Sequence, residues 1–124
     1  MNSGQIRPEI SPTRRQSSLR HKRDFESISK NGLSRANPLL VLRAARNDLT
    51  YSRSALIVSR KVQTRAVARN KIRRRLRHII RNSPLTSGWD MLFIARRASS
   101  RATYQELTEA IRNATRRANI LRKE

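Results

Sequence analysis

Hydrophobic positions recur at helical spacing in three segments of the chain, which predicts three helices. The first segment covers residues 19–32, where Asp24 can cap a short helix and Phe25 and Ile28 fall on one side. An Asn-Gly pair near its end is a typical helix stop. This segment is therefore predicted to be a short helix with one apolar side.

The other two helical segments are longer. The second covers residues 65–81 and places four apolar residues on one side, Ile72, Leu76, Ile79 and Ile80. Ahead of the third, Thr103 and Glu106 match a capping box, in which each side chain can bond the other residue's backbone N–H. The last helix is predicted to carry its apolar positions at Tyr104, Leu107, Ile111, Ala114, Ala118 and Leu121.

Nearly continuous apolar runs predict three strands, at residues 39–46, 53–59 and 90–96. Continuous runs suit strands that are buried on much of both faces. Residues 47–50 resemble a hairpin turn, so the second strand is expected to return beside the first. Residues 98–102 are expected to form a loop. The predicted order is helix, strand, strand, helix, strand, helix.

The domain organisation follows from the same pattern. The chain has 124 residues, which fits a single domain with a modest core. Residues 1–17 have two prolines, few apolar residues and no periodicity, so we expect a disordered basic tail there. Residues 18–124 are predicted to form the folded domain.

Composition narrows the class of partner. Lys and Arg total 29 against eight Asp and Glu, which gives a formal charge of +21 at pH 7. Such a charge repels itself in a compact fold, and a polyanionic partner relieves that repulsion. The chain has no cysteine, which excludes disulfides, thiolate zinc sites and a cysteine nucleophile. Its apolar runs are far too short to span a membrane.

The helix predicted at residues 65–81 has a strongly basic side. On a helical wheel, the apolar stripe is centred on Ile72. Within roughly 40° of the opposite pole lie Asn70, Arg74, Arg77 and Arg81. Arg73 lies beside this group, and Arg69 and Arg75 flank the apolar stripe. No carboxylate occurs between Asp48 and Asp90, so nothing in the segment neutralises this charge. A solvated face usually mixes charges, and a membrane-binding face needs exposed apolar groups, so we favour a nucleic-acid-binding face.

Residues outside this row complete the candidate chemistry. Arg60, Lys61 and Arg65 extend the basic surface to the helix start, where backbone N–H groups also favour phosphate. Phe25 fits either the core or a stacking platform for a single-stranded base. The histidines, His21 and His78, have no nucleophile–base pattern around them, and the carboxylates are scattered. The residues therefore indicate a binder of RNA or DNA without catalytic residues or a metal site of its own.

A family resemblance adds to this reading. The segment SRKVQTRAVARNKIRRRLRHIIR, residues 59–81, resembles the signature of the protein component of bacterial ribonuclease P. LRHKRDFESISKNG, residues 19–32, is similar to that family's first helix, and WDMLFIARRAS, residues 89–99, to its last strand. The last helix begins with the family's Thr-Tyr pair. The resemblance covers residues 18–121.

The resemblance implies a fold and an activity. The fold would be an α/β (α+β) sandwich like the second domain of ribosomal protein S5, ordered α-β-β-(β)-α-β-α with a left-handed crossover. The activity would be that of a non-catalytic subunit, which helps a catalytic RNA to remove the 5′ leader of precursor tRNA. Mg²⁺ would be bound mainly by that RNA, and none by the protein alone. The partners would be this RNA and precursor tRNA in the cytoplasm, with no membrane and no obligate protein partner.

The resemblance also implies site residues. The leader would lie in a cleft between the first helix and the sheet, beside Phe25, Ser29 and Arg43. RNA would be bound by Arg60, Lys61, Arg65, Arg69, Asn70, Lys71, Arg73, Arg74, Arg77 and Arg81.

Some positions depart from the family pattern. Lys71 replaces an Arg of the signature, and a Lys cannot form the bidentate fork of a guanidinium. Ser29 and Arg43 stand where many members have aromatic residues, which shifts the expected leader contacts from bases toward phosphates. Two rival hypotheses remain at this point, a structural RNA-binding protein of ribosomal type and a DNA-binding domain with its basic helix in a major groove.

Overall fold

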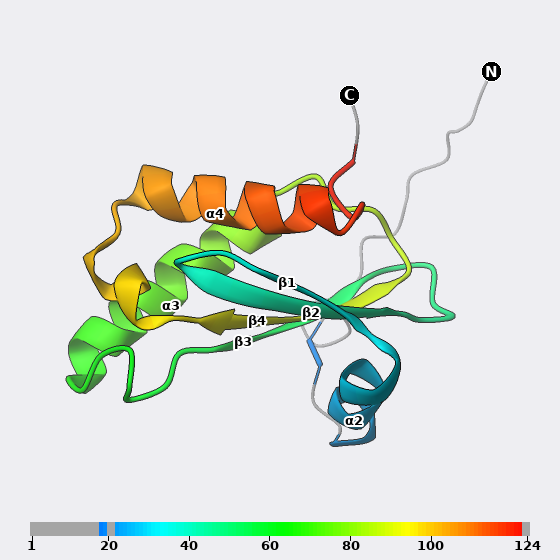
Figure 1. Cartoon of the computed structure of the whole chain (residues 1–124), viewed down its shortest axis with the longest axis horizontal. Coiled ribbons are helices and arrows are strands. Elements are labelled where there is room, and N and C mark those ends of the chain that lie inside the picture. Colours follow the sequence, from blue (N-terminus) through cyan, green and yellow to red (C-terminus); the bar gives the residue numbers. More distant parts are fainter. Residues whose placement is uncertain (1–17, 20–21, 123–124) are drawn as a thin grey trace.

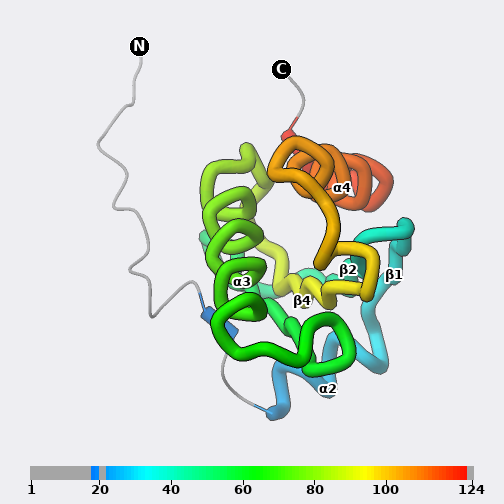
Figure 2. Tube along the Cα trace, turned by 90° about the vertical axis from the view of Figure 1, so that its left-hand side faces the viewer, coloured from blue at the N-terminus to red at the C-terminus, as the bar shows by residue number. Residues whose placement is uncertain are grey.

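In the computed structural model, a four-stranded sheet carries helices on both faces (Figure 1). The structure describes residues 18–19 and 22–122, so the predicted tail at residues 1–17 lies outside the described residues. In chain order the elements are α2 (Lys22–Asn31), β1 (Leu33–Ala36), β2 (Leu40–Arg46), β3 (Arg53–Ile57), α3 (Ala66–Arg81), β4 (Trp89–Ala95), the 3-10 helix η1 (Arg97–Arg101) and α4 (Tyr104–Arg117). Helices α3 and α4 cover one face, and α2 lies on the other (Figure 2).

The elements predicted from the apolar pattern are all present, and two more occur. Strand β1 occupies residues where the apolar pattern predicted no strand, and it brings the number of strands ahead of α3 to three, the number that the implied fold has with its optional strand. Its four residues alternate between half-buried and exposed, which is too short a pattern to distinguish from a loop. Helix η1 occupies most of the predicted loop at residues 98–102.

The strand order is β1-β2-β4-β3, so the predicted hairpin between β2 and β3 is wrong. Strand β4 lies between them, antiparallel to β2 and parallel to β3. Residues 47–50 do turn the chain, but the backbone N–H of Asn47 bonds Gly88, just ahead of β4, at 2.8 Å. Strand β4 is the most continuously buried strand, because helices α3 and α4 cover one of its faces and α2 covers the other.

Strand β3 lies at the edge of the sheet, and the prediction that it is buried on much of both faces is wrong. Strands β2 and β4 are largely buried, whereas every residue of β3 is partly or fully exposed. Strands β3 and β4 are joined through α3, which gives the parallel crossover of the implied fold. The left-handed sense of that crossover stays an expectation.

The main core lies between the sheet and helices α3 and α4. Its fully buried large side chains include Leu42 and Phe93 from the sheet, Leu76 from α3 and Ile111 from α4. A smaller cluster lies under α2 on the opposite face and is made of Leu19, Ile28, Ala45 and Leu92, with Phe25, Ala55 and Ile94 packed against it. The sheet therefore carries a large core on the face of α3 and α4 and a smaller apolar cluster on the face of α2.

Specific hydrogen bonds define both ends of α4. Thr103 and Glu106 form the predicted capping box, with bonds of 3.1 and 2.8 Å. The helix ends at Arg117, so the prediction that it continues through Ala118 and Leu121 is wrong. Asn119 adopts a positive φ of 60°, and the N–H of Ile120 bonds the carbonyl of Thr115 at 2.8 Å, as in a Schellman motif. Leu121 instead forms a bridge with Leu85.

Candidate RNA-binding surface

Helix α3 is anchored on one side and exposed on the other. Its buried residues are Ile72, Leu76, Ile79 and Ile80, which confirms the predicted stripe. Asn70, Arg74, Arg77 and Arg81 are all exposed. The helix therefore presents a row of polar and cationic side chains on a rigid support, as the wheel predicted.

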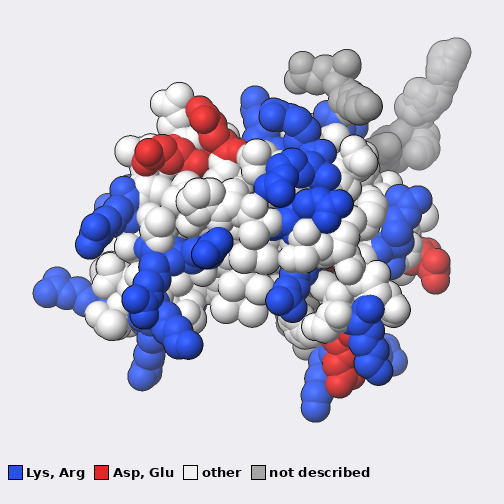
Figure 3. Space-filling model, viewed as in Figure 1, with Lys and Arg blue, Asp and Glu red and all other residues white. Residues whose placement is uncertain are grey.

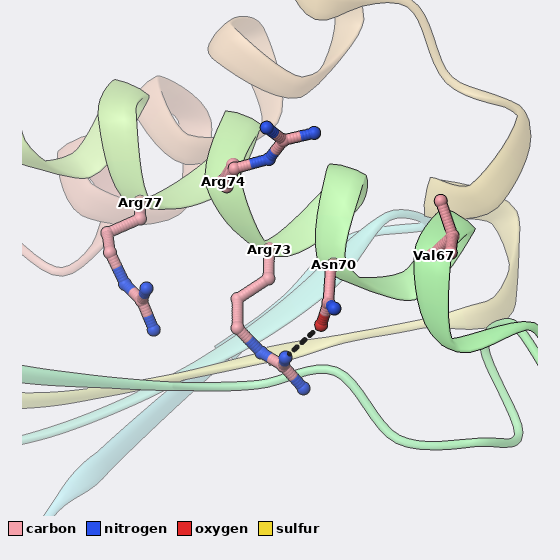
Figure 4. Close-up of a pocket in the computed structure, with 5 residues that line it drawn as sticks. All are labelled: Val67, Asn70, Arg73, Arg74 and Arg77. Atoms are coloured by element: carbon pink, nitrogen blue, oxygen red, sulfur yellow. Dashed lines mark hydrogen bonds between the residues drawn. The ribbon is translucent and has the colours of Figure 1, made fainter.

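Part of this row borders an open hollow on α3, shown in Figure 4 and lined by Val67, Asn70, Arg73, Arg74 and Arg77. Arg73 and Arg77 extend to the same side of the helix, whereas Arg74 extends the other way. The Arg73 guanidinium donates to Asn70 Oδ1 at 2.7 Å, which holds both side chains in place. The hollow is thus a concave, cationic surface that suits a phosphate backbone.

Two arginines of the predicted set also stabilise the protein itself. Arg73 donates to the carbonyl of Val58 at 3.5 Å. Arg69 donates to the carbonyls of Gln63 and Thr64, at 3.1 and 3.3 Å, and so ties the turn before α3 to the helix. Each guanidinium has five N–H groups, so both arginines retain donors for an RNA phosphate.

The remaining predicted cations lie around the start and middle of the helix. Arg60 and Lys61 are exposed in the turn after β3, and Lys71 is exposed on α3. Arg65 is the N-cap residue and makes no side-chain cap, so the first N–H groups of α3 are not capped by it. Figure 3 shows Lys and Arg in several separate groups on one face of the molecule, with Asp and Glu in a few places.

The residues predicted to line a leader cleft lie on the other face of the sheet. Phe25 is half-buried and packs on the small cluster under α2, while Ser29, one helical turn later, is exposed. Arg43 is exposed on β2, two residues before Ala45 of the same cluster, so it points to this same face of the sheet. The three residues therefore share one face. Whether they hold a leader stays a prediction.

An ionic network that the sequence did not indicate fixes α2 to the sheet. Arg53 donates to both oxygens of buried Asp90, at 2.9 and 2.6 Å, and to Asp24 at 3.2 Å. The amide of Asn47 also donates to Asp90, at 2.8 Å. The hydrogen bond to Asp90 raises the pKa of Arg53, against the effect of burial.

Asp24 is therefore not the helix cap that was predicted. Helix α2 begins at Lys22, which places Asp24 in its first turn, and the carboxylate accepts a hydrogen bond from β3. The sequence shows only an isolated Asp, Asp90, near the start of an otherwise apolar strand, and that does not identify its partners. Its partners are 37 and 43 residues away, beyond the reach of local patterns.

The described residues form neither a metal-binding cluster nor a membrane-spanning helix. Within residues 18–19 and 22–122, no three His, Cys, Asp or Glu residues gather closely enough to hold a metal ion. No helix in the same part of the chain has the length and apolar character needed to cross a membrane.

Comparisons with known sequences identify the family. Residues 13–119 match the family described as Ribonuclease P. The ribonuclease P protein component of Clostridioides difficile (strain 630) is 35% identical over 105 residues, which are 82% of this chain and 91% of that protein. The same component of Xanthomonas oryzae pv. oryzae (strain MAFF 311018) is 36% identical over 108 residues, covering 86% of this chain and 74% of that protein.

Solved structures agree with the sequence matches. The RNase P protein of Staphylococcus aureus superposes with a TM-score of 0.75 at 27% identity, covering 86% of this chain and 98% of that one. The RNase P protein of Thermotoga maritima gives a TM-score of 0.72 at 33% identity, with 81% and 96% covered. These likenesses confirm the mixed α/β sandwich. The chain belongs to the ribonuclease P protein family.

Proposed function

We propose that this protein binds the catalytic RNA of ribonuclease P and the 5′ leader of precursor tRNA, and so assists removal of the leader. The chemistry would take place on the RNA subunit, with Mg²⁺ bound mainly by that RNA in the bacterial cytoplasm. The observation that carries the proposal is α3, whose exposed side carries a row of polar and cationic groups, Asn70, Arg74, Arg77 and Arg81, in a chain of this family.

The two faces of the sheet would bind different RNA segments. The α3 row would neutralise phosphates of the catalytic RNA, since guanidinium groups bind phosphate oxygens in pairs. On the opposite face, Phe25, Ser29 and Arg43 would contact the single-stranded leader. A half-buried ring such as Phe25 can offer one face to a base while the other stays packed on the cluster under α2.

A salt titration tests the RNA-binding role of α3. The double variant Arg74→Ala, Arg77→Ala removes two exposed cations that make no hydrogen bond within the described part of the chain. We expect weaker binding to ribonuclease P RNA, and a plot of log affinity against log salt that is shallower by roughly one unit or less per lost phosphate contact.

The matched control removes the same charge from elsewhere. The double variant Arg97→Ala, Arg101→Ala does so on η1, where both side chains are exposed. If the control and the α3 variant lose affinity equally, the effect is one of net charge and the assignment of the α3 row is wrong. Circular dichroism of both variants should match the original protein, because none of the four side chains is buried.

A further inference from the structure

A second hollow lies between the end of α3 and the start of α4, and it shares no lining residue with the hollow beside Arg74 and Arg77. Its apolar part is formed by Ile79, Pro84 and Leu121, and its polar rim includes Asn82, Tyr104 and Arg112. These residues come from α3, from the loop after it, from α4 and from the segment after α4. The two helices that border the hollow, α3 and α4, lie on the sheet face opposite to α2 (Figure 2), and none of the residues that line it belongs to the predicted RNA-binding set.

Tyr104 is an exposed aromatic side chain that lines this hollow. Of the large hydrophobic residues exposed in the described part of the chain, Tyr104 alone is aromatic, with 45% of its surface accessible. Its ring is tilted by 48° against His78, at 6.1 Å between centroids. An exposed ring that lies beside a hollow can stack on an unpaired base.

Arg112 supplies an uncommitted positive charge on the same rim. Within the described residues its guanidinium makes no hydrogen bond and no ion pair, although Glu109 lies one turn earlier on α4. By contrast, Arg117 on the same helix donates to the carbonyl of Ala36 at 2.8 Å. The charge of Arg112 is therefore available to a phosphate.

Asn82 adds hydrogen-bonding capacity. Its amide nitrogen donates to the carbonyl of His78 at 2.8 Å, which fixes the side chain at the end of α3. Its carbonyl oxygen makes no hydrogen bond within the described residues. A fixed amide oxygen can accept from the exocyclic amino group of a base.

We propose that this hollow binds one unpaired nucleotide of the catalytic RNA. Its base would stack on Tyr104 and be read by Asn82, and its phosphate would pair with Arg112. The inference rests on the proposed function and adds a nucleotide-binding site on the other flank of α3. The catalytic RNA is the occupant because the residues predicted to hold the leader lie on the opposite face of the sheet.

Affinity for the catalytic RNA tests the site. Tyr104→Ala and Arg112→Ala should each weaken binding about fivefold or more, since stacking on an aromatic ring and a charged contact carry effects of this size. The double variant should lose less than the product of the two, because both side chains hold the same nucleotide. Tyr104→Phe should bind almost as tightly as the original protein, because it keeps the ring.

Arg116→Ala is the matched control. It removes the same charge from the next turn of α4, where the side chain is exposed and does not line the hollow. We expect less than about a twofold change. Equal losses for Arg112→Ala and Arg116→Ala, or unchanged binding by Tyr104→Ala, would overturn the site. In both cases the original protein still binds the RNA, so the proposed function survives; if the original protein fails to bind, the proposed function itself is wrong.

A crosslinking measurement covers the case in which Tyr104→Ala unfolds. Ultraviolet irradiation of the complex of original protein, catalytic RNA and precursor tRNA should join the Tyr104 peptide to a single-stranded nucleotide of the catalytic RNA. A crosslink of that peptide to the leader, or to neither RNA while α3 peptides are joined, would overturn the assignment.

Discussion

The ionic network between α2 and the sheet makes a sharp prediction for Asp90→Asn. The carboxylate of Asp90 is buried and accepts three hydrogen bonds, two from Arg53 and one from Asn47. The substitution keeps the shape of the side chain, removes its charge and places an NH₂ group among donors. Arg53 is then left with Asp24 as its only anionic neighbour in the described structure.

The size of the effect follows from burial. The side chains of Arg53 and Asp90 are 20% and 9% exposed, so water compensates little for the lost pair. Removing one partner of a buried pair costs about 3–5 kcal/mol of unfolding free energy, and we expect about 3 because Asp24 remains. Asp24→Asn removes a single contact of 3.2 Å, and we expect a loss of about 1.5 kcal/mol.

Urea denaturation followed by circular dichroism measures both losses. The single Trp of the chain, Trp89, lies in β4 beneath the guanidinium of Arg46, so its fluorescence reports on the same sheet and tests two-state behaviour. If Asp90→Asn costs less than about 1 kcal/mol, or less than Asp24→Asn, the network does not hold α2 as described. The reasoning would then overstate the burial of the pair.

Two further predictions concern α2. Gly32→Ala should destabilise the protein by about 1–3 kcal/mol in thermal melts, because the new Cβ would lie 2.3 Å from the carbonyl oxygen of Ile28 and 2.6 Å from that of Ala44; an unchanged melting temperature would contradict this close approach. Phe25→Ala should weaken binding of leader-bearing precursor tRNA by roughly tenfold while sparing mature tRNA. Equal losses for both tRNA forms, with a large drop in melting temperature, would show that Phe25 acts only as core.

Helix α3 was the most predictable element. Its apolar stripe, its basic row and its limits are all encoded within 17 consecutive residues, 65–81, and α3 runs from Ala66 to Arg81. The capping box of α4 is likewise local. Such features depend on residues three or four positions apart, which a sequence shows directly.

The features that were mispredicted depend on distant partners. The turn at residues 47–50 has the composition of a hairpin turn, and only the insertion of β4, some 40 residues later, separates β2 from β3. Asp is a residue type that commonly caps helices, but Asp24 instead accepts a hydrogen bond from Arg53 on β3. The hollow beside Tyr104 could not be predicted for the same reason. In the sequence Tyr104 fits an apolar helix position, and only the folded chain brings α3 and the loop after it next to this side chain.

Reconstituted cleavage tests the central claim most directly. Precursor tRNA with a labelled 5′ end is incubated at low Mg²⁺ with ribonuclease P RNA alone, with the purified protein alone, and with both together. The account predicts that the protein alone releases no leader and that adding it to the RNA raises the rate of correct 5′ cleavage. Correct cleavage by the protein without RNA, or a rate with RNA that the protein leaves unchanged, would contradict the account.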